Sequence, residues 1–346
     1  MSFGLPQKVN LAVLPTRLER LARWSARLGR EIWIKRDDLT EAAAGGNKIR
    51  KLEYLLRGAL DEGADTLVTC GGIQSNHARA TAILGRRLGL RSVLLLRGTP
   101  ADALEGNYLL DRLVGAEVVY VSAEEYEQRN KILAQVADDL RARGRKPYVI
   151  PEGGSNALGA MGYVEMVGEL KEQMRAQDVA LDSILCPLGS GGTLAGILMG
   201  VALYGLPVQV YGVSVQRDAG YFIRAVEAIF EEAVQKLGFP ARVPRQAIRI
   251  IEGYAGLGYG LSTPEEMSLI ASLAEEEGIV LDPVYTGKAF RALDDRVRRG
   301  EASKDLGGRI LFVHTGGIFG LFPQRTVLEE ALGGLRKRAL GGDAPR

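Results

Sequence analysis

The sequence predicts an α/β fold with mostly parallel sheets, and three observations support this prediction. Short β-branched runs alternate with longer segments of helical periodicity along nearly the whole chain, which is the pattern of strand–helix–strand units. Within the strand runs, apolar residues follow one another without alternating with polar ones, as expected for strands covered on both faces. Several of these runs end in glycine-rich turns that lead into a helix.

The expected strands and helices follow one another in order along the chain. Strands are expected at residues 31–35, 66–69, 92–96, 117–121, 148–150, 184–186, 208–215 and 309–313. Helices are expected between them, for example at residues 48–60, 76–88, 123–143 and 264–277. A length of 346 residues allows two domains. Because glycine-rich turns at residues 44–46 and 153–159 bracket a βαβα segment, we expect two open, twisted α/β domains: a smaller inserted one at residues 52–158, and a larger one built from residues 1–51 and 159–346.

Composition and charge argue against several classes of partner. Apolar residues make up 46% of the chain, charged residues 25%, and the formal net charge is +2, all ordinary for a soluble globular protein. Nothing in this balance requires a nucleic acid or an anionic membrane surface as partner. The two cysteines, Cys70 and Cys186, are too few for a disulfide framework, so a reducing, cytoplasmic setting is expected.

Two segments resemble targeting or membrane signals but favour another interpretation. Residues 11–30 are Arg-rich and amphipathic, like a mitochondrial transit peptide, yet Pro15 and Glu19 favour a structural first helix. Residues 183–216 contain no charged side chain and are long enough to span a bilayer. Pro187, Pro207 and many glycines divide this segment, so we expect a buried strand, a loop, a buried helix and a further strand.

The clearest glycine-rich turn lies between an expected strand and an expected helix. It consists of Gly189, Ser190, Gly191, Gly192 and Thr193. Glycines let backbone N–H groups approach a ligand, and a helix N-terminus is partly positive, so the turn predicts a phosphate cup. The alternative is a tight turn without a ligand. The GxGxxG spacing of a dinucleotide site and the Gly-Lys-Ser/Thr of a Walker A loop are absent here.

Two further turns follow the same scheme at the ends of other strands. After the strand at 66–69, four hydrogen-bonding side chains stand where α/β proteins bind ligands, namely Gln74, Ser75, Asn76 and His77. Capping of the next helix is an alternative role for Ser75 or Asn76, and a lone His77 is more often structural than a base. Thr315 follows the strand at 309–313. The sequence shows no metal-ligand spacing and no supported GxSxG nucleophile elbow.

Two lysines follow a pair of glycines in the stretch AAAGGNKIRKLEY. Lys48 comes two residues after the glycines, and Lys51 lies one helical turn further on. A phosphate cup, polar groups at strand ends and a lysine beside glycines suggest pyridoxal phosphate, because an aldehyde cofactor needs the amine of a lysine. Lys51 would direct positive charge towards the phosphate. The alternative for each lysine is a solvated helix face.

The chain resembles the pyridoxal-phosphate family that contains D-cysteine desulfhydrase and 1-aminocyclopropane-1-carboxylate (ACC) deaminase. The likeness rests on the motifs KRDDL, GGNKIRKLEYLL, GADTLVTCGGIQSNHARATA, PEGGSNALGAMGYVE, GSGGTLAG, GYGLST, LDPVYTGKA and HTGGIFG, which occur in order over nearly the whole chain. The resemblance implies the fold of the tryptophan synthase β-subunit group, fold type II, with the cofactor in the cleft between the two domains. It also implies a homodimer.

The resemblance implies cofactor-binding roles for matching residues. The lysine of GGNK, Lys48, would form the Schiff base with the cofactor. Lys51 would lie near the phosphate, which the loop from Gly189 to Thr193 would hold. Asn76 would meet the 3′-oxygen of the cofactor ring.

Substrate-binding roles follow from the same likeness. Ser75 would meet the substrate carboxylate or the reacting carbon, and Asn76 and His77 belong to the same substrate loop. Tyr259 of GYG and Tyr285 of DPVY would face the substrate.

Two positions favour the D-cysteine desulfhydrase branch of the family. ACC deaminases typically have Glu after the tyrosine of DPVY and Leu in the HxGG turn, whereas this chain has Thr286 and Thr315. We expect one of these threonines to contact the pyridine nitrogen. A threonine hydroxyl stabilises a protonated ring less than a carboxylate does. D-Cysteine requires only loss of its α-proton and departure of a good leaving group, while ACC has no α-hydrogen.

The predicted activity is therefore a carbon–sulfur lyase that converts D-cysteine to pyruvate, hydrogen sulfide and ammonia, with Lys48 as the base. Within the family, ACC deaminase, L-cysteate sulfo-lyase and other amino-acid lyases are alternatives, because the motifs do not distinguish enantiomers or leaving groups. A pyridoxal-phosphate-binding protein that senses ligands without catalysis is an alternative of a different class.

Overall fold

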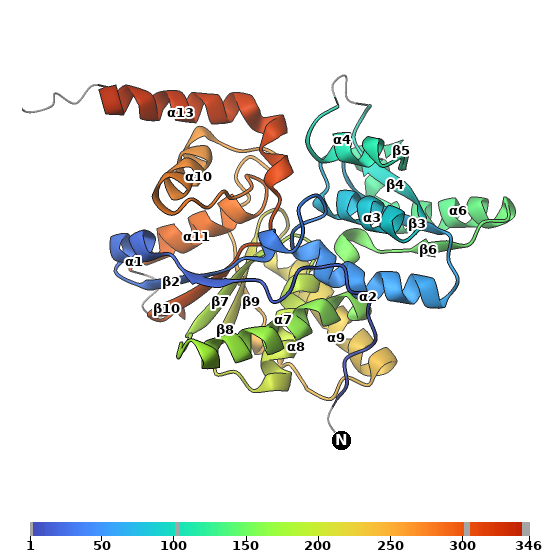
Figure 1. Ribbon diagram of the computed structural model, residues 1–346, viewed down its shortest axis with the longest axis horizontal. Helices are drawn as coiled ribbons and strands as arrows, with labels where there is room; N and C mark the ends of the chain where they lie inside the picture. The colour runs from blue at the N-terminus through green and yellow to red at the C-terminus, as the bar shows by residue number, and fades with distance from the viewer. Residues whose placement is uncertain (1–2, 101–103, 301–304, 341–346) are drawn as a thin grey trace, which may run out of the picture.

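The strands form two separate sheets, which lie in two lobes of the molecule (Figure 1). This computed structural model of the chain describes residues 3–100, 104–300 and 305–340. The predicted α/β class with mostly parallel sheets is confirmed. The limits expected for the two domains, residues 52 and 158, stay a prediction, although every strand of the smaller sheet falls between them.

The larger sheet has six strands. In spatial order they are β1 (Leu18–Arg20), β2 (Glu31–Lys35), β10 (Arg309–Val313), β7 (Ser183–Leu188), β8 (Gln209–Ser214) and β9 (Arg249–Ile251). Only the edge strand β1 runs antiparallel to its neighbour. The carboxyl ends of the other strands therefore meet at one edge, where α/β proteins place their ligands.

The smaller sheet has four strands, all parallel. Their spatial order is β5 (Glu117–Val121), β4 (Arg91–Arg97), β3 (Thr66–Gly72) and β6 (Pro147–Val149). The helices of the described chain are α1 (Ala22–Leu28), α2 (Asn47–Asp61), α3 (Asn76–Arg87), α4 (Gly106–Leu113), α5 (Ala123–Glu127), α6 (Arg129–Ala142), α7 (Ala157–Ala176), α8 (Gly192–Tyr204), α9 (Ala219–Leu237), α10 (Pro264–Glu277), α11 (Thr286–Arg298) and α13 (Arg325–Leu340).

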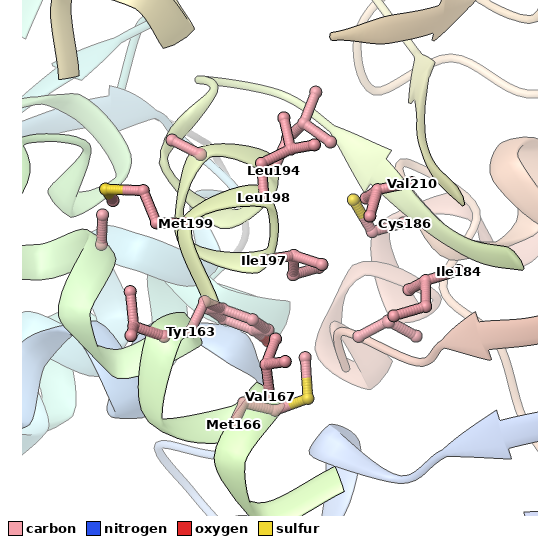
Figure 2. Packing of buried hydrophobic residues seen from close by; sticks show 14 of the residues in the cluster. Tyr163, Met166, Val167, Ile184, Cys186, Leu194, Ile197, Leu198, Met199 and Val210 are labelled. Atoms are coloured by element: carbon pink, nitrogen blue, oxygen red, sulfur yellow. The ribbon is translucent and has the colours of Figure 1, made fainter. Parts of the chain in front are cut away.

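Helices cover both faces of the larger sheet, so its strands read as continuous apolar runs. Along β10, Leu311 and Val313 pack with α7, α8 and α9, while Ile310 and Phe312 pack with α1, α10 and α11. Figure 2 shows the first of these layers, in which side chains of α7 and α8 lie against Ile184, Cys186 and Val210 of β7 and β8 (Tyr163, Met166, Val167, Leu194, Ile197, Leu198 and Met199). No helix of the described residues is both long and apolar enough to cross a bilayer.

A buried charge network anchors α2, the helix that begins beside the cleft. Arg50 is fully buried, and its guanidinium pairs with Asp37 at 2.8 Å and with Glu169 of α7 at 3.0 Å. Tyr163 of α7 donates to the same Asp37 carboxylate at 2.7 Å. Because an arginine and two carboxylates satisfy one another here, the start of α2 is held rigidly against α7 and the large sheet.

Two sequence predictions are corrected. Residues 11–30 do not form one first helix: only Ala22–Leu28 is helical, because Leu18–Arg20 pairs with β2 as an edge strand and buries Leu18. The single helix expected at residues 123–143 is two helices that meet at Gln128, and the first of them starts from a capping box at Ser122. The uncharged segment at 183–216 does form a strand, a loop, a helix and a strand, and both cysteines are free and buried.

Candidate active site

The carboxyl ends of β3, β7 and β10 and the start of α2 surround one cavity. Of the residues predicted from the sequence, its lining includes Lys48, Ser75, Asn76, His77, Gly189, Ser190, Gly191, Thr193, Tyr259, Tyr285 and Thr315. Lys51, Gly192 and Thr286 are not part of that lining. Segments far apart in the sequence thus meet in one cavity between the two sheets. In the described part of the chain, no cluster of His, Cys, Asp and Glu side chains could hold a metal ion.

The glycine before α2 is required by a close approach of two backbones. Gly46 has a φ of 118°, and a Cβ atom there would lie 2.7 Å from the carbonyl oxygen of Thr315. The backbone N–H of Asn47 donates to the same carbonyl at 3.0 Å. Only glycine meets both conditions without strain. This contact fixes Lys48, the second residue of α2, against the turn after β10.

Lys48 has an amine suited to covalent chemistry. Burial lowers the pKa of its ammonium from 10.5 to about 8, although the carboxylates of Glu152 and Asp282 act in the opposite direction. A lysine with such a pKa is partly neutral near physiological pH, and the neutral amine is the form that attacks a carbonyl or accepts a proton.

The loop between β7 and α8 forms an open cup at the N-terminus of the helix. Its cap residue Gly191 has a φ of 93° and, as a glycine, brings no side chain of its own to cap α8. The N-terminus of a helix leaves N–H groups and a partial positive charge available to a ligand. Thr193 at the rim accepts a hydrogen bond from the Asn47 side chain at 3.0 Å, which ties the cup to the start of α2.

Ser155, two residues before the start of α7, lies underneath this cup. Its hydroxyl oxygen lies 2.8 Å from that of Ser190 and accepts the N–H of Gly192 at 3.1 Å. A Cβ atom on Gly192 would lie 2.6 Å from the Ser155 hydroxyl and 2.8 Å from the ammonium nitrogen of Lys51. Ser155 and Lys51 therefore pack so closely against the backbone of Gly192 that no side chain fits at that position.

Lys51 has a buried amine with no acidic partner among the described residues. Its Nζ donates to the carbonyl of Gly153 at 3.1 Å and to the hydroxyl of Ser155 at 3.3 Å. Burial, and next the charge of Lys48, lower its pKa well below 10.5. Among the residues that the structure describes, no carboxylate pairs with it. A buried ammonium held only by neutral oxygens is expected where an anion binds, since unpaired buried charges are costly.

Tyr259 and Tyr285 form a pair at another wall of the cavity. The Tyr285 hydroxyl donates to the Tyr259 hydroxyl at 3.0 Å, and their rings meet edge to face with centroids 5.9 Å apart. Burial raises the pKa of both phenols above 10. Both are therefore protonated at neutral pH, and Tyr259, which accepts the proton of Tyr285, keeps its own O–H for a ligand. Glycines at 72 and 189 let the two rings pack on the backbone, at 3.0 Å and 2.8 Å from where a Cβ would stand.

Ser75, Asn76 and His77 lie in the turn from β3 into α3. Ser75 caps α3 by accepting the N–H of Ala78 at 3.1 Å, and Asn76 accepts a hydrogen bond from Asn107 at 3.0 Å. The capping reading is thus correct for Ser75, which also lines the cavity. Residues in such turns are positioned by the helix that they start.

His77 is a neutral imidazole. Its Nε2 lies 2.9 Å from the hydroxyl of Thr69, whose own proton goes to the carbonyl of Ile150 at 2.9 Å. The hydrogen between His77 and Thr69 therefore belongs to Nε2, which leaves Nδ1 as an acceptor that has no partner among the described residues. Burial, followed by the charges of Lys48 and Lys51, lowers the pKa of His77 well below 6.5.

The two predicted threonines differ in position. Thr315 lines the cavity, whereas Thr286 is buried at the start of α11, where its hydroxyl bonds to Asp282 at 2.7 Å. The N–H of Asp282 donates to the same hydroxyl at 2.7 Å. The Thr286 side chain is fully used in holding this turn, so the structure does not bring it to the cavity. His314 holds the neighbouring turn by accepting the N–H of Gly316 at 3.2 Å.

Sequence reasoning missed several residues of the site. Asn47, Arg97, Glu152 and Gln216 line the cavity and Ser155 lies under the cup. A signal existed for two of them, because Glu152 and Ser155 flank the double glycine of PEGGSN, a turn of the same kind as the three that were recognised. Arg97 at the end of β4 could have been proposed from the same strand-end rule.

A comparison with known families and proteins gives consistent results. A family model described as pyridoxal-phosphate dependent enzyme matches residues 9–316. A putative 1-aminocyclopropane-1-carboxylate deaminase of Thermotoga maritima is 46% identical over 318 residues, which cover 92% of this chain and 98% of that protein. D-cysteine desulfhydrase of Serratia proteamaculans is 43% identical over 321 residues, covering 91% and 95%. The bifunctional D-cysteine desulfhydrase/1-aminocyclopropane-1-carboxylate deaminase, mitochondrial, of Arabidopsis thaliana is 40% identical, covering 97% and 84%.

Solved structures agree with this result. The crystal structure of an ACC deaminase homologue has a TM-score of 0.86 and 41% sequence identity, and the match covers 94% of this chain and 96% of that one. A threonine deaminase has a TM-score of 0.64 at 20% identity, a likeness of fold alone.

Proposed function

The chain belongs to the family of pyridoxal-phosphate dependent enzymes, and from that premise we propose that it is a lyase that converts D-cysteine and water to pyruvate, hydrogen sulfide and ammonia. The observation that supports the proposal most directly is Lys48, a buried amine with a pKa of about 8 that lines a cavity beside the glycine-rich N-terminus of α8. The relatives named D-cysteine desulfhydrase support the choice of substrate.

The residues of the cavity suit pyridoxal phosphate. Its phosphate would be held by the loop from Gly189 to Thr193, with the N-terminus of α8 behind it. Lys51 would complete the charge balance, because its ammonium lies 3.3 Å from the Ser155 hydroxyl under that loop and has no acidic partner among the described residues. Lys48 would hold the cofactor's aldehyde, and Asn76 its ring hydroxyl.

When bound, pyridoxal phosphate supplies an aldehyde for the substrate's amine and a ring that withdraws electrons from the α-carbon. Lys48 would take the α-proton, since its lowered pKa leaves a neutral amine near pH 8. Ser75 at the start of α3 would orient the substrate carboxylate. The hydroxyls of Tyr259 and Tyr285 are protonated and joined at 3.0 Å, so this pair would provide a proton for the departing sulfur.

The presence of Thr315 in the cavity wall favours, as the substrate, an amino acid that has an α-hydrogen. A hydroxyl at the cavity wall does not stabilise a positive pyridine ring as a carboxylate would, and we propose Thr315 rather than Thr286 for that contact. A weaker electron sink is sufficient when the first step is loss of an α-proton. ACC has none, so its ring opening would have to begin differently.

ACC deamination is nevertheless a second candidate. Relatives at 40–46% identity include proteins named putative ACC deaminase and one named as a bifunctional enzyme. L-Cysteate and other β-substituted amino acids remain further candidates within the same reaction class. We also propose a cytoplasmic location, which the two free, buried cysteines support. The family resemblance supports a homodimer, and light scattering of the purified protein tests this oligomeric state.

Two experiments test the proposal. Borohydride reduction followed by peptide mapping should place the cofactor on Lys48, and Lys48→Ala should lose the visible absorbance band, whereas Lys236→Ala on the exposed face of α9 should keep it. Pyruvate release should then be assayed with D-cysteine, β-chloro-D-alanine, L-cysteate, L-cysteine and D-serine, and 2-oxobutyrate release with ACC. Product from ACC alone would contradict the argument from Thr315, and cofactor binding without any product would favour a sensor.

A further inference from the structure

Arg97 is a cation of the cavity that the mechanism above does not use. It is the last residue of β4 and lines the active-site cavity. Together with Gly72 and Tyr259 it also lines a neighbouring cavity. These three residues therefore form the boundary between the two spaces, at the wall that contains Tyr259.

Aromatic faces hold the Arg97 guanidinium in place, not acids. Its central carbon lies 5.1 Å from the ring centroid of Tyr126 and 5.1 Å from that of Tyr259. Such contacts fix the plane of a guanidinium while leaving its N–H groups available. Among the residues that the structure describes, no carboxylate forms an ion pair with it.

The acidic side chains in this region already have partners. Glu152 accepts a hydrogen bond from Tyr126 at 2.9 Å and pairs with Arg129 at 2.9 Å. Glu127, whose pKa is lowered chiefly by Arg217, pairs with that arginine at 2.9 Å. Arg97 consequently remains available to an anion from outside the chain.

The other anionic groups of the proposed reaction have their own binding groups. The phosphate belongs to the α8 cup and Lys51, and the substrate α-carboxylate to the turn at Ser75. The remaining negative charge is the one that develops on the β-substituent when its bond to Cβ breaks. We propose that Arg97 is a specificity-determining residue, which binds the β-substituent of the substrate and selects amino acids whose β-substituent is an anion or leaves as one.

This inference rests on the proposed β-elimination and adds the class of leaving group. In that step the α-proton goes to the base, the electron pair of the Cα–H bond forms the Cα–Cβ double bond, and the Cβ–X pair leaves with X. For a thiol the departing group is a thiolate, and for a sulfonate it is sulfite. A guanidinium next to Tyr259 stabilises either charge and assists proton donation from the tyrosine pair.

The test compares Arg97→Gln and Arg97→Lys with the wild type and with Arg91→Gln. Arg91 is the exposed first residue of the same strand, so its loss removes a charge without altering the cavity. Each cofactor-loaded protein is assayed for pyruvate from D-cysteine, D-cysteate, L-cysteate and D-serine. The exchange of the α-proton of D-alanine in D₂O, followed by NMR, reports on a substrate analogue that has no leaving group.

For Arg97→Gln, the ratio of elimination from the best anionic substrate to α-proton exchange of D-alanine should fall about 10- to 100-fold, the factor of one charge-assisted hydrogen bond. Arg97→Lys should recover part of this loss, and Arg91→Gln should match the wild type. The ratio of pyruvate release from the best anionic substrate to pyruvate release from D-serine should be smaller in Arg97→Gln than in the wild type.

Two results would overturn the inference alone. The first is an equal fall of elimination and D-alanine exchange in Arg97→Gln, which would assign Arg97 to the α-carboxylate or to the scaffold. The second is no change in either rate. Absence of pyruvate from every substrate with wild-type protein is a different outcome, because it would refute the proposed elimination itself and the inference with it.

Discussion

Replacing Lys51 by methionine should affect the cofactor-free and the cofactor-loaded protein in opposite directions. The side chain is 1% exposed. Its two hydrogen bonds, to Gly153 and Ser155, are 3.1 and 3.3 Å long and go to neutral oxygens. In the free protein the burial of this amine is therefore compensated only weakly, and its strongly lowered pKa has the same cause.

The expected magnitudes follow from this geometry. Methionine has a similar length and is apolar, so the free energy of unfolding of the cofactor-free protein should stay the same or rise by up to about 2 kcal/mol. In the loaded protein the phosphate would lose one charge-assisted hydrogen bond, worth about 1.5–3 kcal/mol, which corresponds to about 10- to 100-fold weaker cofactor binding.

The assay combines denaturant unfolding of the cofactor-free protein with a titration of pyridoxal phosphate followed by visible absorbance. Lys236→Met is the matched control, because that lysine is exposed on α9 and its pair with Glu232 lies on the surface; its effect should stay within about 0.5 kcal/mol. A loss of more than about 1 kcal/mol in cofactor-free Lys51→Met, or unchanged cofactor affinity, would refute the reasoning.

Three further outcomes are expected. The rate of cofactor attachment to Lys48 should rise about tenfold per pH unit at low pH and level off above a pH of about 8, because the neutral amine reacts; a flat stopped-flow profile would contradict this. Gly192→Ala should weaken cofactor binding about tenfold or more, since its Cβ would collide with the base of the cup, whereas Gly333→Ala, with nothing within 4 Å, should bind normally in the same titration. Lys288→Met should lower kcat about tenfold, because the lysine donates to two carbonyls of the Tyr259 loop at 2.7 Å each; unchanged kcat and unchanged proteolysis of that loop would exclude this role.

The parts of the fold and site that could be predicted are those written in contiguous residues. The apolar runs at 184–186 and 309–313 identified central strands because both faces of the larger sheet are covered. The glycine-rich turn at 189–193 and the pair before Lys48 identified close approaches of backbone, one of which is the contact of Gly46 with Thr315. In each case the local sequence states a steric requirement directly.

The parts that could not be predicted depend on contacts between distant segments. The short edge strand Leu18–Arg20 exists through its pairing with β2, which local propensity does not report. Ser155 reaches the cup of α8 only because the turn before α7 lies against Ser190 and Gly192. Thr286 looked equivalent to Thr315 in sequence, yet its hydroxyl turns to Asp282, four residues before it. The direction in which a side chain points depends on its packing in the folded chain, and the sequence motif alone does not give it.

Charge compensation differs between the anchor of α2 and the cavity. At the anchor, Arg50 is buried between the carboxylates of Asp37 and Glu169. At the cavity, Lys51 and Arg97 form no ion pair within the described residues, and Lys51 is buried against neutral oxygens. An uncompensated buried charge costs free energy, so an anionic ligand would stabilise this arrangement. The proposed reaction brings two such groups, the phosphate next to Lys51 and the departing anion next to Arg97.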